Sequence, residues 1–460
     1  MSLSPALRYL QQHHDRFLAE LEAFLRIPSV STTPRHKEDM AHAANWVADN
    51  LRAIGAREVA VFPTAGHPVV YGAFAAAQPQ APTILIYGHY DVQPPDPLEA
   101  WESPPFEPAV RGERLYARGA TDMKGQVMAS LKAIEAAVHG GLPVNVKCLI
   151  EGEEEIGSPD LADFIAEHRE MLAADVCLNP DAGMLGPEWP TITYALRGLA
   201  YFELRVYGPA HDLHSGVYGG VVHNPAQALA ELLAGMHDEH GRVTLPGFYD
   251  KVRPLSPEER AALQQLPFDP EAALLAQTGV PALWGEPEYT PVERLGARPT
   301  LEINGLYSGF TEAGAKTVIP AYAMAKISCR LVPDQDPDEV AEQLRAYLQA
   351  RAPRTIRWEL DVMTGAPPAM TDIHTPAVRA LAQAMEATWG TPPLYRREGG
   401  SIPVVGQMQQ ILGLDSVLTG FGLPDANIHA PNENLHLPTW RKGMEALVRF
   451  FYRFSEENHV

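Results

Sequence analysis

Hydrophobic positions in the first 180 residues of the chain follow two alternating periods. Short apolar runs rich in β-branched residues, such as Thr83–Tyr87, are typical of strands buried on both faces of a sheet. Between these runs, apolar residues recur at helical spacing. Strands are expected at residues 58–62, 69–74, 83–87, 144–150 and 175–178, and helices at residues 4–27, 37–55, 125–138 and 160–172. This alternation predicts an α/β domain with a mainly parallel sheet flanked by helices.

The order of elements changes near Leu199 and becomes strand, helix, strand, strand, helix, strand. The order predicts a ferredoxin-like α+β unit, which a proline-rich and partly helical segment interrupts at residues 237–298. The expected ranges are Tyr201–Tyr207, Asn224–Met236, Thr300–Asn304, Tyr322–Leu331, Asp336–Arg351 and Thr355–Val362.

Helices resume after Met363 and leave too little chain for a separate core. Helices are expected at Pro376–Trp389, at Pro403–Leu412 and from Pro438, with a strand at Asp415–Leu418. We therefore expect residues 1–198 and 365–460 to form one catalytic domain, into which residues 199–364 are inserted.

Length and composition are those of a globular protein of two domains. The chain has 460 residues, of which 46% are hydrophobic and 20% charged. No run of 18 uncharged apolar residues occurs, so no transmembrane helix is expected. Charged residues and histidines fill the N-terminal region where a signal peptide would need an apolar run, so a cytoplasmic location is expected.

Charge and cysteine content exclude several classes of function. The formal net charge of −21 disfavours binding to nucleic acid or to anionic membranes. Cys148, Cys177 and Cys329 are far apart and lack Cys-x-x-Cys spacing. Buried structural thiols are expected, and a disulfide framework is not.

Polar residues follow the central strand directly. His89 and Asp91 come after Gly88, where the end of a parallel strand opens into the crevice in which such sheets bind ligands. A carboxylate at Asp91 can accept the second ring N–H of a histidine ligand. Asp122 follows a second glycine-containing turn and precedes a helix. A histidine and an aspartate in these places are also common as turn and capping residues.

Three further strand or loop ends carry acids or histidine. The segment EGEEEIGS, residues 151–158, sets four carboxylates within five positions, which repel one another unless a cation or a helix N-terminus compensates. Asp181 follows a strand in NPDAG, and His429 lies in a loop. Taken singly, these segments also fit a solvated acidic turn, a turn aspartate and a loop histidine. Together with His89 and Asp122 they form a set of imidazole and carboxylate ligands that suits zinc or manganese.

One arginine is distinguished by its place in a strand. Ala323, Ala325, Ile327, Cys329 and Leu331 share one face of the expected strand, and Lys326, Ser328 and Arg330 share the other. A guanidinium on such a polar face can pair bidentately with a carboxylate, although a solvent-exposed arginine fits the pattern equally well.

Taken jointly, these segments resemble the di-zinc aminoacylase and carnosinase type of metallopeptidase over nearly the whole chain, and look most like its cytosolic dipeptidase branch. The matching segments are GHYDVQP, ARGATDMKG, EGEEEIGS, NPDAG, ITYALRG, DLHSGVYGG, GAKTVIP, RLVPDQ, REGGSIPV and IHAPNE. EGEEEIGS departs from the family at Glu153, where relatives often carry methionine.

The resemblance implies two divalent metal ions per chain, with zinc expected and manganese or cobalt as alternatives. One ion would be held by His89 and Asp181 and the other by Glu155 and His429. Asp122 would bridge the two ions and would be followed by a cis peptide bond.

The resemblance also implies roles in catalysis. Glu154 would be the general base, and Asp91 would orient His89. His214 would reach the active site of a partner protomer as an oxyanion donor, which implies a homodimer, so that the inserted domain would serve as a lid and a dimerisation domain. Arg330 would bind the carboxylate of the substrate, and Thr317, Gly400 and Ser401 would lie on segments that contact it.

The expected function is therefore hydrolysis of the amide bond of dipeptides, or of similar small substrates with a free carboxylate, by metal-activated water. No serine or cysteine nucleophile motif competes with this hypothesis, because GGSIP is not the GxSxG turn of a nucleophilic serine. Alternatives within the class are deacylation of N-acyl amino acids and a carboxypeptidase-like reaction. Alternatives outside it are a two-metal phosphoesterase and a metal-binding interaction protein without catalysis.

Overall fold

The computed structural model describes residues 3–78, 80–264 and 266–458. The chain forms two compact units. Unit 1 consists of Met1–Tyr194, Thr371–Arg396 and Gln407–Val460, and unit 2 of Ala195–Met370 and Arg397–Gly406. Unit 2 thus interrupts unit 1 in the sequence.

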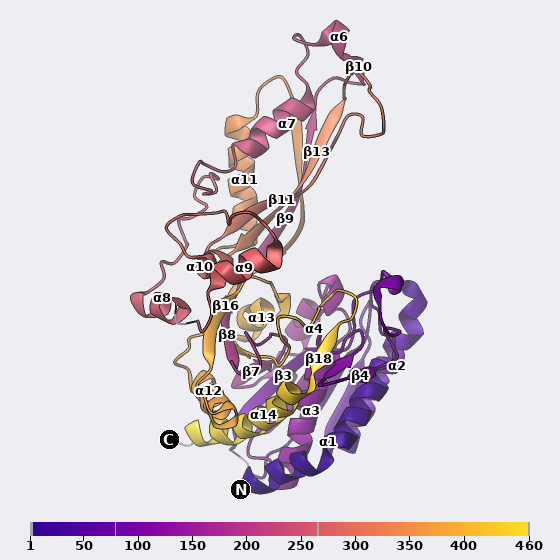
Figure 1. Ribbon diagram of the computed structural model, residues 1–460, viewed down its shortest axis with the longest axis vertical. Coiled ribbons are helices and arrows are strands. Elements are labelled where there is room, and N and C mark those ends of the chain that lie inside the picture. Colours follow the sequence, from indigo (N-terminus) through magenta and orange to yellow (C-terminus); the bar gives the residue numbers. More distant parts are fainter. Residues whose placement is uncertain (1–2, 79, 265, 459–460) are drawn as a thin grey trace. The chain divides into compact units, whose positions relative to one another are not determined.

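The central element of unit 1 is strand β3, Thr83–His89, the expected buried strand. It lies between β6, Asn145–Glu151, and β7, Val176–Asn179, and runs parallel to both. β17, Ser416–Leu418, continues the parallel part beside β7. The predicted parallel core of an α/β domain is confirmed (Figure 1).

The edges of this nine-stranded sheet are antiparallel, so the sheet as a whole is mixed. Its strand order is β1-β2-β6-β3-β7-β17-β8-β15, with β16 paired to β8. The antiparallel strands are β1 (Glu58–Phe62) and β2 (Val69–Phe74) on one side, and β8 (Thr191–Leu196), β15 (Ala369–Met370) and β16 (Leu394–Glu398) on the other. β8, β15 and β16 were not among the expected strands. β15 has only two residues, and a strand this short is defined by its neighbour more than by its own pattern.

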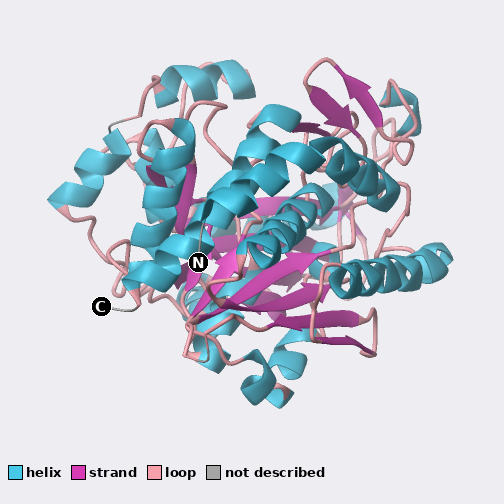
Figure 2. Cartoon of the chain, turned by 90° about the horizontal axis from the view of Figure 1, so that it is seen from below, coloured by secondary structure: helices cyan, strands magenta, loops and turns pink. Residues whose placement is uncertain are grey.

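Helices flank this sheet (Figures 1 and 2). They are α1 (Leu3–Leu25), α2 (Lys37–Ala53), α3 (Lys124–Gly140), α4 (Leu161–Glu167), α5 (Arg169–Leu172), α12 (Pro376–Trp389), α13 (Pro403–Gln407) and α14 (Leu437–Glu457). Two expected helices are broken. The helix expected at residues 160–172 is divided into α4 and α5 at His168, and α13 continues as the π-helical turn Met408–Leu412.

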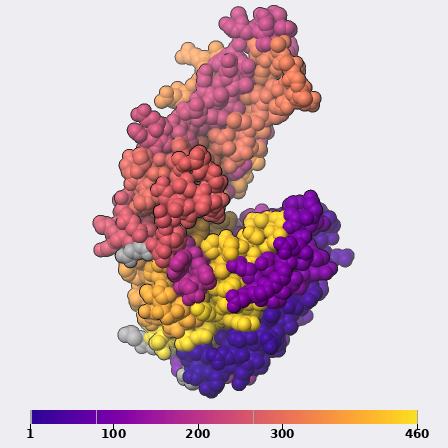
Figure 3. Space-filling view, in the orientation of Figure 1, coloured from indigo at the N-terminus to yellow at the C-terminus, as the bar shows by residue number. Residues whose placement is uncertain are grey.

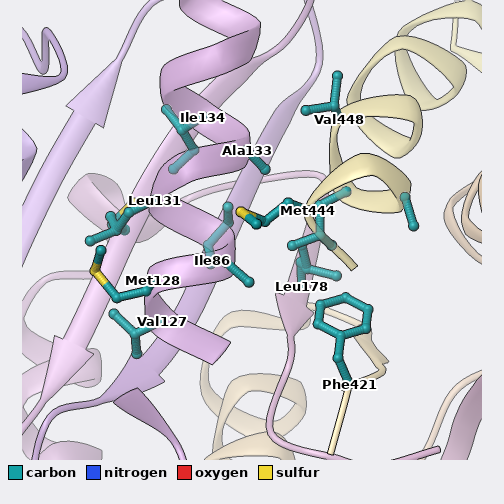
Figure 4. Close-up of a cluster of buried hydrophobic side chains, with 14 of the residues drawn as sticks. Ile86, Val127, Met128, Leu131, Ala133, Ile134, Leu178, Phe421, Met444 and Val448 are labelled. Atoms are coloured by element: carbon teal, nitrogen blue, oxygen red, sulfur yellow. The ribbon is translucent and has the colours of Figure 1, made fainter. Parts of the chain in front are cut away.

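The core of unit 1 lies between the sheet and helices α3 and α14. Ile86 of β3 and Leu178 of β7 are buried with Leu131 of α3 and Met444 of α14 (Figure 4). Every residue of α3 from Lys124 to Ala137 is buried, which is why this helix shows little amphipathic pattern in the sequence. The C-terminal end of β3 and the start of α3 are therefore both packed into this core.

Three very short strands make a separate small sheet in unit 1. They are β4 (Ala109–Arg111), β5 (Arg114–Tyr116) and β18 (Asn434–His436), in the order β18-β5-β4. Three residues are too few to show a period, so these strands were not among the expected ones. The pairing of β18 with β5 joins segments some 320 positions apart in the sequence.

Unit 2 has the expected ferredoxin-like order. β9 (Gly198–Tyr207), α7 (Pro225–Ala234), β11 (Thr300–Ser308), β13 (Tyr322–Leu331), α11 (Pro337–Arg351) and β14 (Arg357–Ala366) follow one another. The sheet order is β11-β13-β9-β14 with antiparallel neighbours, and α7 and α11 pack on it. Alternate residues of β13 are buried as predicted, from Ala323 to Leu331.

The interrupting segment of unit 2 is partly helical, as expected. Its helices are α8 (Pro257–Gln264), α9 (Pro270–Thr278) and α10 (Pro291–Ala297). A two-stranded ribbon of β10 (Leu213–His214) and β12 (Val318–Ile319) leads into the short helix α6 (Ser215–Tyr218).

Two expectations from composition concern the whole chain. Cys148, Cys177 and Cys329 are buried and unpaired, which confirms the prediction of structural thiols. Among the described residues, no helix combines the length and the apolar character needed to cross a membrane.

Candidate metal centre

His89 is the last residue of β3 and is fully buried. Its Nδ1 lies 3.0 Å from the backbone carbonyl oxygen of Asp91 and 3.3 Å from Oδ1 of the Asp91 carboxylate. With Nδ1 as the donor, Nε2 carries the free lone pair, and it makes no hydrogen bond within the described part of the chain. A buried imidazole nitrogen held in this way has the tautomer and the environment of a metal ligand.

Two carboxylates face this nitrogen. Oδ1 of Asp122 lies 3.2 Å and Oδ2 of Asp181 lies 3.9 Å from Nε2 of His89. Asp122 precedes α3, and Asp181 follows β7 in a turn in which the side chain of Asn179 accepts the N–H of Asp181. His89, Asp122 and Asp181 thus form one group that could hold a cation, with all ligand atoms within 4.8 Å of one another.

A second group lies on the other side of Asp122. Nε2 of His429 is 3.0 Å from Oδ2 of Asp122 and 3.1 Å from Oε2 of Glu155. Glu155 belongs to the 3₁₀ turn Glu154–Ile156 that follows β6. The N–H of Glu155 donates to Asp91, and its carboxylate accepts from Gln93, so it is oriented from the β3 side.

Asp122 is the residue that the two groups share. One of its oxygens faces His89 and the other faces His429, so Asp122 offers one ligand atom to each group. The Asp122–Met123 peptide bond is cis, as the resemblance implies. The donor set of two imidazoles and three carboxylates fits a pair of borderline or hard divalent cations such as zinc or manganese.

Burial and mutual interactions shift the pKa values of the titratable side chains in this centre. Burial, together with the neighbouring carboxylates of Glu155 and Asp122, raises the pKa of Glu154 to about 7. Burial and Asp122 raise the pKa of Asp181 well above its ordinary value. Hydrogen bonds to Asp122 and Glu155 raise the pKa of His429 to about 10. Divalent cations would relieve this repulsion and hold the carboxylates in their ionised form.

Glu153, the departure from the family pattern, is oriented differently from its two neighbours. It is 4% exposed, and its Oε1 accepts the backbone N–H of His67 at 3.2 Å. Gly66 lies so close to this carboxylate that a β-carbon at that position would overlap Oε1. Glu153 therefore binds the loop between β1 and β2, and burial raises its pKa.

Arg330, Gly400 and Ser401 lie together in unit 2. Nη1 of Arg330 donates to Oγ of Ser401 at 2.7 Å, and Gly400 precedes this serine in an exposed loop. Among the residues that the structure describes, no carboxylate forms an ion pair with Arg330. Burial lowers the pKa of its guanidinium, but an arginine remains charged at neutral pH. An incoming anion would therefore find a charged partner that no carboxylate of the described residues already pairs with.

His214 and Thr317 form another pair in unit 2, on the ribbon of β10 and β12. The carbonyl oxygen of Thr317 accepts the N–H of Ser215, the residue after His214. This ribbon lies beyond the Tyr322 end of β13, whereas Arg330 is close to the other end (Figure 1). Tyr322 and Arg330 are roughly 25 Å apart along β13 at the rise of a β-strand.

Two residues that the sequence analysis overlooked support the centre. Gln93 binds the Glu155 carboxylate, and Glu433 accepts hydrogen bonds from the loop that carries Asp122. Both lie within quoted segments, GHYDVQP and IHAPNE. The sequence does not show which group a loop glutamine or glutamate will bind. The only indication of Gln93 and Glu433 in the sequence is that they lie within these matching segments.

The fold and the centre together define a metallopeptidase. Residues 85–453 match peptidase family M20/M25/M40, and the chain belongs to this family. The resemblance noted in the sequence is thereby confirmed, and family membership favours peptide hydrolysis over the phosphoesterase alternative.

Particular relatives cover nearly the whole chain. The chain is 31% identical to the Cys-Gly metallodipeptidase of Schizosaccharomyces pombe, over 99% of each chain. It is 30% identical to the human Beta-Ala-His dipeptidase, over 99% of this chain and 93% of the relative. Among solved structures it is similar to the M20 family metallo-carboxypeptidase Sso-CP2 from Sulfolobus solfataricus. That likeness has a TM-score of 0.86 and 35% identity, over 96% of this chain and 99% of the other.

Proposed function

We propose that this metallopeptidase is a dipeptidase with a dinuclear metal centre. The observation that carries the proposal is the position of Asp122, whose two oxygens face two separate groups of ligand atoms. Dipeptide hydrolysis is supported by the names of relatives from yeast and human that match almost the full chain.

His89 and Asp181 would hold one ion, Glu155 and His429 the other, and Asp122 both. Zinc fits this donor set, with manganese or cobalt as alternatives. When bound, such ions supply Lewis acidity, which lowers the pKa of the attacking water and polarises the scissile carbonyl. Asp91 would keep the Nε2 lone pair of His89 directed at its ion.

Glu154 would be the general base. An ionised carboxylate beside the ions can accept the proton of the attacking water at neutral pH. As the new C–O bond forms and the C–N bond breaks, Glu154 would return this proton to the leaving amine. The proposal is supported by the position of Glu154 between the buried Glu153 and the ligand Glu155.

Arg330 would bind the free carboxylate of the substrate, since no carboxylate of the described residues already pairs with it. Ser401 would hold this guanidinium in place, and Gly400 and Thr317 would lie on segments that contact the substrate. His214 would donate to the oxyanion: its Nδ1 accepts the N–H of Gly216 at 2.9 Å, so the neutral ring carries its proton on Nε2.

A homodimer is part of the proposal, and the place of His214 in unit 2 supports it. His214 lies on the β10-β12 ribbon beyond the Tyr322 end of β13, and Arg330 lies near the other end of β13, so both would serve one substrate only if a second copy supplied His214. Exposed apolar residues next to His214 support a contact there: Val217 is 66%, Tyr218 43% and Val221 86% exposed. The segment that carries them forms the magenta tip of unit 2 in Figure 3. Residues 199–364 would then act as a lid and a dimerisation domain. The three buried free thiols favour a reducing compartment, in agreement with the proposed cytoplasmic location.

A substrate panel tests the proposal. The protein is stripped with a chelator, reconstituted with zinc, manganese or cobalt, and assayed on Ala-Ala, N-acetylalanine, Ala-Ala-Ala and p-nitrophenyl phosphate. We expect activity to disappear on chelation, to return with metal, and to be highest on the dipeptide.

The other substrates represent the rival functions. Faster hydrolysis of N-acetylalanine would identify a deacylase, and faster release of the last residue of Ala-Ala-Ala would identify a carboxypeptidase. The second is a specific alternative because the similar Sso-CP2 structure is that of a metallo-carboxypeptidase. Phosphate release exceeding all peptide cleavage would contradict the proposal altogether.

A further inference from the structure

Glu433 is a fully buried carboxylate four residues after His429. It accepts four hydrogen bonds, all from the loop that ends in Asp122. Oε2 accepts from Nη1 of Arg118 and from the N–H of Gly119, both at 2.8 Å. Oε1 accepts from the N–H of Thr121 at 2.9 Å and from the N–H of Asp122 at 3.0 Å.

This carboxylate therefore joins two loops that each carry a proposed metal ligand. Asp122 lies on the first loop and His429 on the second, and their sequence separation is large. The backbone adds one bond between the loops, from the N–H of Ala117 to the carbonyl oxygen of Glu433.

The loop of His429 is held in a conformation that it would not adopt alone. His429 and Asn432 both have a φ of 61°, in the left-handed region that non-glycine residues rarely occupy. Such residues persist only where the surrounding structure over-determines them. The four hydrogen bonds to the Glu433 carboxylate hold this loop against the loop of Asp122, four residues after His429.

We propose that Glu433 is a positioning residue that sets the separation of Asp122 and His429, and thereby the affinity of the centre for its ions. This inference rests on the proposed metal centre. Glu433 itself lies on the backbone side of Asp122, not on its carboxylate side, so it acts through Asp122 and does not hold an ion.

The replacement Glu433→Gln isolates this role. Glutamine has nearly the same shape but only one acceptor oxygen, and its amide group would face two of the four donors. Glu135→Gln is the matched control in the same unit. Glu135 is another buried carboxylate with several donors, Tyr9, Arg16 and Lys132, and it contacts neither loop.

The experiment measures cobalt binding by the full chain. Parental protein and variants are loaded with Co²⁺, their visible absorption spectra are recorded, and the metal is withdrawn by a competing chelator. We expect Glu433→Gln to bind cobalt about 10–100-fold more weakly, with an altered spectrum, as is usual when a partner of a metal ligand is removed. Glu135→Gln should keep the parental affinity and spectrum, even where its thermal midpoint falls.

Parental affinity and spectrum in folded Glu433→Gln would overturn the inference. Should that variant not fold, Glu433→Asp decides the question: it keeps the charge opposite Arg118 but is one methylene too short to reach all four donors, and it should also bind cobalt more weakly. Failure of the parental chain to bind cobalt would instead contradict the metal centre itself. The two failures are therefore distinguishable.

Discussion

Four glutamates within five residues show how the environment of a side chain decides its chemistry. Glu151 is buried and accepts hydrogen bonds from Tyr87 and Ser158. Glu153 binds the loop between β1 and β2, Glu154 is the proposed base, and Glu155 is a proposed ligand. These glutamates differ in role because their side chains point in different directions from the end of β6 and meet different partners.

The role of Glu154 predicts a selective loss. Glu154→Gln keeps the shape of the side chain but removes the group that accepts a proton. We expect kcat to fall by about 10²–10⁴-fold. Metal analysis should still find about two ions per chain. Glu153→Gln is the control, because its carboxylate faces the loop at His67, and it should keep most of the activity. Full activity of Glu154→Gln would contradict the assignment, and it is what a non-catalytic interaction protein would show.

Glu151 predicts a dependence of stability on pH. Burial raises its pKa to about 8, so the native state keeps a proton that the unfolded chain releases near pH 4.5. The native state then binds more protons between these values, and its contribution to stability falls as the pH rises from 5 to 8.

The replacement Glu151→Gln should remove this slope. In urea unfolding with a chelator present, we expect the loss of stability between pH 5 and pH 8 to be about 2–4 kcal/mol smaller in the variant than in the parent. Equal slopes for the two proteins would show that Glu151 is already ionised at pH 5.

At the scale of elements, the start of α3 is fixed by close packing next to Asp122. Gly125 lies in the first turn of this helix, and a β-carbon there would be 2.1 Å from the carbonyl oxygen of Ala120. The buried Trp440 of α14 donates from Nε1 to the carbonyl oxygen of Gly125 at 2.8 Å. Gly125 thus contacts both the loop that carries Asp122 and helix α14.

Gly125→Ala should disturb both the packing of α3 against α14 and the loop that carries Asp122. The overlap involves backbone, which side-chain rotation cannot relieve, so we expect a loss of about 1–3 kcal/mol in stability. A lower thermal midpoint and weaker metal retention are the measurable results. Gly305→Ala in unit 2 is the control, since the nearest atom to its β-carbon would be 3.5 Å away. An unchanged midpoint for Gly125→Ala would mean that the turn can shift freely.

At the scale of the whole molecule, the proposed site needs residues from two chains. His214 lies on the ribbon beyond the Tyr322 end of β13, and Arg330 lies roughly 25 Å from Tyr322 at the rise of a β-strand. An active site that uses both therefore requires the isologous pairing of a homodimer, in which each copy lends its His214 to the other.

Mixing two inactive variants tests this pairing. His214→Ala and Glu154→Gln should each be inactive alone. After dissociation and random reassociation at equal concentrations, mixed dimers contain one complete site, so activity should return to about a quarter of the parental value. A mixture that stays inactive although mass spectrometry of the intact dimers shows mixed dimers would place His214 in its own chain's site.

The sequence by itself determined the elements whose burial is periodic. The central strands and the long amphipathic helices were predicted nearly to the residue, because a buried face imposes a repeat on the residues that form it. Ordered agreement of many short segments also determined the family. The short strands β4, β5 and β18 escaped prediction, because three residues carry no period and their partners are distant in the sequence.

Only the tertiary structure decided where each polar side chain points. Glu153 and Glu155 look alike in the sequence, yet one binds the loop at His67 and the other faces His429. Glu433 is an ordinary loop glutamate until the fold brings it against the backbone of Asp122. The physical reason is that hydrophobic burial follows local spacing, whereas the partners of a charge are set by distances between segments that meet only in the folded chain.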